Sequence, residues 1–267
     1  MKKIKFLFTL YLFIFSALTI NSQEYKFEHL GIKHGLSHSF IYTLDQDNNG
    51  LLLVGTGEGV GVYDGKSFQM FNSGNRLAEN FVSSSLTDSK GNIWFGHKKG
   101  GSSIYKDKAF DVVHSGDGIN SIVNDIAEDS EGRIWFATQN RGLYFVDSLG
   151  QFEFFLESFP SYLLESIFFH DGFIFIGSDK GLEVYKYFED ENILSKVQEV
   201  SGLSNLAIID VIGVNNSEIF IVSKDGVFFK LINNDGIYLT EKLLIRNLPE
   251  KIVVRELLSH ENILYIS

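Results

Sequence analysis

A pattern of apolar and polar positions recurs six times along the chain. Each copy begins at the end of a polar turn, continues through three to five mostly apolar residues, and then reaches a small residue and another strand-like run. The copies follow one another at intervals of 41, 41, 40, 45 and 44 residues, starting at Gly50, Gly91, Gly132, Gly172, Ser217 and Glu261. A period of about 40–45 residues in a strand-rich chain is typical of β-propeller blades.

One repeat predicts one blade of four antiparallel strands. In the second repeat, Asp88 and Gly91 occupy the first and fourth positions of a type I turn, which would join the first two strands. The four strands are expected at Phe81–Thr87, Ile93–Phe95, Ser103–Lys106 and Ala109–Val113. Successive blades should bury a bulky residue at the same place, namely Trp94, Trp135, Phe175 and Phe220.

The predicted fold is therefore an all-β propeller of four-stranded blades. The mean repeat of about 42 residues gives five blades and part of a sixth, and we expect seven blades in the complete ring. The last repeat reaches Ser267 within its second strand, so the sequence is expected to be a fragment of a longer protein. Tyr25–Leu30 has the pattern of a fourth strand and is expected to close the ring as the outer strand of the last blade.

The first 22 residues lie outside the repeats. Three lysines precede an apolar stretch from Phe6 to Ile20, and a small polar run follows it at Asn21–Gln23. This layout predicts a secretory signal peptide over residues 1–22, because the apolar stretch is shorter than the roughly 20 residues that span a bilayer. Residues 23–267 are assigned to the propeller, which is expected on the periplasmic or extracellular side with no membrane contact of its own.

Composition narrows the classes of protein further. The chain has no cysteine, which excludes a disulfide framework and a thiolate metal site. Its formal net charge of −11 argues against nucleic acid as a partner, because phosphates are bound by clusters of Lys and Arg. With 25 Phe and 11 Tyr, the chain has the aromatic side chains needed to fill a core.

The first repeat resembles the two-component regulator propeller repeat. The matching features are Gly35-Leu36, the turn from Asp47 to Gly50, the strand that ends in Gly55-Thr56, and a following glycine-rich turn. The second and third repeats match well, and the later ones match mainly in spacing, with Val222 where glycine is expected. The resemblance implies an extracytoplasmic sensor region of Bacteroidetes-type bacteria, followed in the full protein by a transmembrane helix and a signalling module such as a histidine kinase.

Motifs for metal or catalysis are weak. Asp45, Asp47 and Asn49 copy the opening of a calcium loop, but Thr56 stands where a bidentate Glu is required, so a structural turn is favoured. His34 and His38 are spaced closely enough to bind a metal ion as a pair, but two solvated loop histidines are the favoured interpretation. No nucleophile motif of the type G-x-S-x-G occurs. We therefore expect no catalytic residues, no metal and no cofactor.

The loops on one face of the propeller are the better candidates for binding. The turns between second and third strands supply our candidate ligand residues, His97, Lys98, Gln139, Asn140, Arg141, Glu58, Asp179 and Lys180, and the same turns also hold Lys99. The connections between fourth and first strands add a secondary set, His34, His38, Arg76, Asn80, Asp117 and Asn120.

These candidate residues suit a small-molecule or oligosaccharide ligand. The alternative partner is a downstream domain of the same protein. The leading hypothesis is a non-catalytic sensing or interaction propeller, and a homodimer of the full-length protein is left open. The alternative is an exported propeller lyase or hydrolase that acts on carbohydrate.

Overall fold

The computed structural model describes residues 27–114, 121–147, 149–150, 152–155, 159, 161, 163–215, 218–234, 236–245, 254, 257–260 and 263–266. The expected signal peptide, Tyr25, Lys26, Asp117 and Asn120 lie outside these residues. Contacts divide the chain into two units, Met1–Leu30 and Gly31–Ser267. In the first unit, residues 27–30 form no strand, in contrast to the expected outer strand of the last blade.

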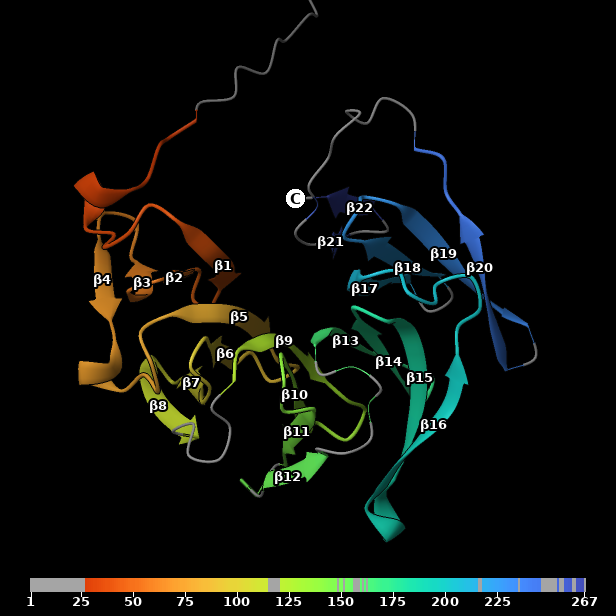
Figure 1. Cartoon of the computed structure of the whole chain (residues 1–267). Helices are drawn as coiled ribbons and strands as arrows, with labels where there is room; N and C mark the ends of the chain where they lie inside the picture. The colour runs from red at the N-terminus through yellow and green to blue at the C-terminus, as the bar shows by residue number, and fades with distance from the viewer. Residues whose placement is uncertain are drawn as a thin grey trace, which may run out of the picture. The chain divides into compact units, whose positions relative to one another are not determined.

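The second unit is built of antiparallel sheets whose strands follow one another in sequence order (Figure 1). The first sheet contains β1 (Ile41–Gln46), β2 (Leu52–Thr56), β3 (Gly59–Tyr63) and β4 (Phe68–Phe71). The second contains β5 (Val82–Thr87), β6 (Ile93–His97), β7 (Ser102–Lys106) and β8 (Ala109–His114). The third contains β9 (Val123–Glu128), β10 (Ile134–Thr138), β11 (Leu143–Val146) and β12 (Phe152–Phe155).

The later repeats form the same arrangement. The fourth sheet contains β13 (Leu164–His170), β14 (Phe173–Ser178), β15 (Gly181–Phe188) and β16 (Ile193–Glu199). The fifth contains β17 (Ile208–Asn215), β18 (Glu218–Ser223), β19 (Phe228–Asn234) and β20 (Ile237–Lys242). The sixth has two described strands, β21 (Leu257–His260) and β22 (Ile263–Ile266). Short 3-10 turns lie at η1 (Ile32–His34), η2 (Ser73–Asn75) and η3 (Glu189–Glu191). The predicted all-β blades are confirmed.

The turn between first and second strands has one design in the first three blades. In the second blade, the Gly91 amide donates to the Asp88 carbonyl at 2.9 Å, and Gly91 has a φ of 81°, which favours glycine. The Asp88 carboxylate accepts the amides of Lys90 and Asn92 at 3.0 and 2.8 Å. The same Asp carboxylate also accepts the indole N–H of Trp94 at 2.9 Å, so the turn holds the adjacent strand as well.

Successive blades meet at their first strands, where side chains bridge to the backbone of the next blade. The Asn124 side-chain amide donates to the Leu164 carbonyl at 2.8 Å. The Asp125 carboxylate accepts the Ile167 amide at 2.8 Å, and Asp210 accepts the Leu257 amide at 2.6 Å. Backbone groups that lack a partner within their own sheet are thereby satisfied across the interface between blades.

A glycine near the end of the second strand makes room for the next blade in the first, second and fourth blades. A Cβ added to Gly55 would lie 2.7 Å from Val82, one on Gly96 would lie 2.5 Å from Val123, and one on Gly177 would lie 2.9 Å from Ile208. The glycine of the repeat is therefore required by close packing between sheets, since none of these three residues has a positive φ.

We expect Gly96→Ala to lower the free energy of unfolding by about 1–2 kcal/mol, because the added methyl group overlaps Ser84 and Val123. Gly57→Ala is the matched control, since its Cβ would make an ordinary contact of 3.6 Å with the Phe81 ring. Urea unfolding of the two variants measures the difference. Equal stabilities would mean that the interface relaxes without cost.

The core lies between facing sheets. One cluster joins Leu53 of the first blade to Phe95 of the second, and another joins Phe175 of the fourth to Ile221 of the fifth. Trp94, Trp135 and Phe175 are buried as predicted. Phe220 is only partly buried against the cluster around Val222, so the prediction is wrong for the fifth blade.

Candidate functional site

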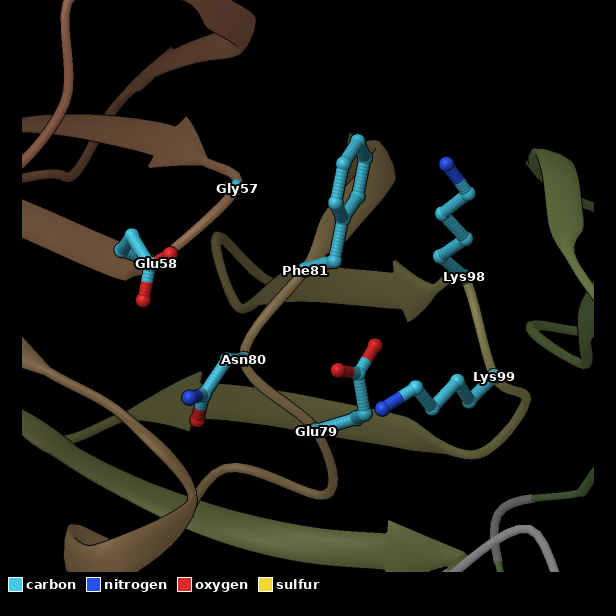
Figure 2. A pocket seen from close by; sticks show the side chains of 7 residues that line it. All are labelled: Gly57, Glu58, Glu79, Asn80, Phe81, Lys98 and Lys99. Carbon is cyan, nitrogen blue, oxygen red and sulfur yellow. The ribbon is translucent and has the colours of Figure 1, made fainter.

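A pocket of about 370 Å³ lies where loops of the first two blades meet (Figure 2). Three segments form it: the turn between β2 and β3, the turn between β6 and β7, and the connection from β4 to β5. The lining residues are Gly57, Glu58, Glu79, Asn80, Phe81, Lys98 and Lys99. The pocket is therefore carried by short loops on a rigid sheet framework, as binding sites commonly are.

The walls of the pocket are held by hydrogen bonds from the blades. The Lys98 amide donates to the Phe81 carbonyl at 3.1 Å, which joins the turn after β6 to the segment before β5. The Thr56 hydroxyl donates to the Gly59 carbonyl at 2.9 Å and fixes the turn that carries Glu58. Asn80 accepts the Ser73 amide at 2.9 Å.

An aromatic and cationic surface forms one side of the pocket. The Lys98 ammonium lies 4.5 Å from the centroid of the Phe81 ring, a distance at which the ring attracts a cation. Phe81 also contacts Tyr42 of β1, with ring centroids 4.6 Å apart. Phe81 is thus fixed between the first strand of the first blade and a lysine of the second blade.

The structure brings two of the eight candidate residues, Glu58 and Lys98, to this pocket. Gln139, Asn140 and Arg141 lie in the corresponding turn of the third blade, and the amide of Asn140 donates to the Ser121 hydroxyl at 3.1 Å. Asp179 and Lys180 lie in the turn of the fourth blade and form an ion pair of 3.7 Å with each other. The role of these residues in binding remains a prediction.

His97 is placed differently from the expectation of a ligand-facing residue. Its side chain is fully buried, and its Nε2 lies 2.8 Å from the Ser103 hydroxyl. Ser103 also accepts the amide of Ala78 at 2.9 Å, so His97 braces the segment that leads to Glu79 and Phe81. Burial lowers the pKa of His97 to about 4, and the imidazole is neutral near pH 7.

The repeats contained a signal for this burial. The residues at the position of His97 in the other blades are Thr56, Thr138, Ser178 and Ser223. These four hydroxyl residues are buried, and their hydroxyl groups hydrogen-bond within the turn that follows. The position is therefore structural in the first five blades, and alignment of the repeats could have removed His97 from the ligand candidates.

Three lining residues, Gly57, Glu79 and Phe81, were absent from both sets, whereas Lys99 was named among the turn residues and Asn80 was in the secondary set. Gly57 adjoins a predicted residue and follows from the same turn. Phe81 was assigned to the predicted strand, whereas β5 begins at Val82 and leaves Phe81 on the loop. The repeat pattern did not indicate that Glu79 lines a pocket, because the turns that complete the pocket lie elsewhere in the sequence.

The suggested calcium and histidine sites have other roles in the structure. Asp47 accepts the amides of Asn49 and Leu51 at 2.8 and 2.9 Å, as expected of a turn. Although burial acts to raise the pKa of Asp47, these hydrogen bonds lower it overall. His34 and His38 accept the backbone amides of Gly31 and Phe40. Among the described residues, no group of three or more His, Cys, Asp or Glu is placed to hold a metal.

The family model described as two component regulator propeller matches residues 117–140, which confirms the predicted resemblance at the third repeat. No curated protein matches the chain. No helix within the described ranges is long and apolar enough to cross a membrane.

Solved structures with this fold include extracellular domains assigned to two component systems, and a lyase. The chain superposes with a TM-score of 0.70 and 19% identity on an extracellular domain assigned to a hybrid two component system from B. thetaiotaomicron, covering 90% of this chain and 34% of that one. A second such domain from B. thetaiotaomicron gives a TM-score of 0.52 and 15% identity over 92% of this chain and 38% of that one.

Virginiamycin B lyase from Staphylococcus aureus gives a TM-score of 0.66 and 12% identity over 85% of this chain and 77% of that one. At these identities the likenesses establish the propeller fold alone. The chain spans about a third of the length of the first two-component structure.

Proposed function

We propose that the chain is an extracytoplasmic sensing or interaction propeller of a membrane-bound signal-transduction protein of the two-component type, and that this region is not catalytic. The proposal is supported above all by the family match at residues 117–140 within a fold similar to extracellular domains of hybrid two component systems. Export by residues 1–22 and a membrane tether elsewhere in the full protein belong to the same proposal.

The pocket gives the proposal a physical basis. Its lining comes from two blades, so a ligand bound there would contact both and change the free energy of their packing. A ligand can shift a conformational equilibrium only through contacts that differ between two states. A site that spans an interface between blades meets this requirement better than a site within one blade.

The alternative, a propeller enzyme acting on carbohydrate, has the fold likeness to virginiamycin B lyase in its favour. The charged residues of the pocket, Glu58, Glu79, Lys98 and Lys99, could act as acids or bases. The two functions differ in outcome, because a sensor returns its ligand unchanged whereas a lyase or hydrolase releases products.

Transcription in the source organism tests the proposal. We expect one nutrient source to induce a set of genes in the wild-type strain and to induce none of them in a strain with residues 27–267 deleted in frame. Restoring the coding sequence should restore induction. Identical responses in both strains would contradict a sensing role, and chemical change of the inducing extract by the purified chain would favour the enzyme.

A further inference from the structure

The pocket contains a carboxylate oxygen that lacks a partner. The Oε2 atom of Glu79 is buried, and among the described residues no donor is within hydrogen-bonding distance of it. Leaving such an acceptor unsatisfied is unfavourable, and more so for a charged group. Figure 2 shows the Glu79 carboxylate directed into the space beside Phe81 and the two lysine side chains. A ligand that donates a hydrogen bond to this oxygen, once the Glu79 side chain turns toward it, would supply the missing partner.

Cationic groups border the same pocket. Lys98 and Lys99 both line it, and both side chains are exposed. None of the ion pairs between described residues includes either lysine. The Lys98 ammonium contacts the Phe81 ring at 4.5 Å, which leaves its hydrogen-bond donors available to an anion.

Together these groups make the pocket dipolar. Glu58 and Glu79 carry two negative charges, and Lys98 and Lys99 carry two positive charges. A purely anionic ligand would meet the carboxylates, and a purely cationic ligand would meet the ammonium groups, so each would incur like-charge repulsion. A neutral saccharide would leave both signs of charge uncompensated. A ligand with both charges can place a positive group against a carboxylate and a negative group against the lysines.

We infer that this pocket binds small zwitterions of the amino acid or short peptide class, with the ligand ammonium at Glu79 and the ligand carboxylate at Lys98 and Lys99. The inference rests on the proposed sensing function and specifies its ligand. A pocket of about 370 Å³ lies at the small end of the usual range for ligand sites, which suits a dipeptide.

Three compounds with one skeleton test the inference by calorimetry on the full chain. Alanylalanine carries both charges, its N-acetyl derivative lacks the ammonium, and its C-terminal amide lacks the carboxylate. We expect alanylalanine to bind and each capped compound to bind at least about tenfold more weakly. Equal binding of all three, binding of methyl glucoside in preference to the dipeptide, or no binding of any probe would overturn the inference.

Substitutions assign each charge to its residue. Glu79→Gln should no longer distinguish alanylalanine from its N-acetyl derivative, and Lys98→Gln combined with Lys99→Gln should no longer distinguish it from its amide. Lys90→Gln is the control, because Lys90 is an exposed lysine of the same blade in the turn between β5 and β6. Unchanged selectivity in the Glu79 and lysine variants would also overturn the inference.

The two experiments distinguish an error in the ligand class from an error in the sensing function. Peptide binding without any transcriptional difference between the wild-type and deletion strains would contradict sensing and leave the ligand class intact. A transcriptional difference together with equal binding of the three compounds would contradict the ligand class and leave the sensing function intact.

Discussion

Asp129→Ala is expected to lower the free energy of unfolding by about 4 kcal/mol, because it removes one partner from a buried ion pair. The Asp129 carboxylate lies 2.6 Å from the Arg133 Nε, and the two side chains are 5% and 12% exposed, respectively. The carboxylate also accepts the indole N–H of Trp135 at 2.8 Å and two backbone amides of its turn at 3.0 Å. The substitution leaves all these donors without their acceptor.

The second blade provides a matched control for this prediction. Asp88 occupies the same place and binds Trp94, but its side-chain partner four residues later is Asn92 instead of an arginine. Asp88→Ala should therefore be less destabilising than Asp129→Ala. Arg76→Ala should have almost no effect, because the Arg76 and Asp111 side chains are mostly exposed.

Urea unfolding measured by tryptophan fluorescence suits these variants, since the two tryptophans of the chain are the ones bound by these carboxylates. Equal losses for Asp129→Ala and Asp88→Ala would show that the ion pair contributes nothing beyond the turn.

Stability should also fall in acid because of His97. The unfolded chain binds a proton at His97 as the pH falls below about 6.5, whereas the folded chain does so only below about 4. The unfolded state therefore binds more protons between these values, and the stability that comes from a neutral His97 is complete above pH 6.5 and is lost toward pH 4. Between pH 7.5 and pH 4.5 the expected loss is about 2.5 kcal/mol.

His97→Gln isolates this effect from the titration of carboxylates. The variant keeps a polar group near Ser103 and cannot become charged, so the stability difference between wild type and variant should change by about 2.5 kcal/mol across that range. A difference that is independent of pH would mean that the His97 imidazole titrates as it does in water.

Much of the fold could be predicted because a blade is specified locally. Asp88 and Gly91 set the first turn of their blade, and the consecutive apolar residues from Ile93 set the strand that follows. Each of these features acts within a few residues of the chain, and six repetitions make the period evident. Predicted strand ends were less accurate, and β6 continues past Phe95 to His97.

The candidate site could be predicted only in part. The repeat pattern identified the turns of Glu58 and Lys98 correctly as loops, but it did not indicate which side chains in them face the pocket. Position along a turn does not distinguish a solvated side chain from one covered by another blade. His97 was assigned to the surface, although it ends β6 and is buried against Ser103 of the same blade.

The sequence by itself determined the period, the four strands of the first five blades and the chemistry of the first turns, because these depend on backbone preferences and on neighbours a few residues away. Only the tertiary structure decided that Gly96 must leave room for Val123 and that Glu79 joins Lys98 at one pocket. Both follow from contacts between segments about 20 to 30 residues apart in the chain, and the packing of whole sheets sets those contacts.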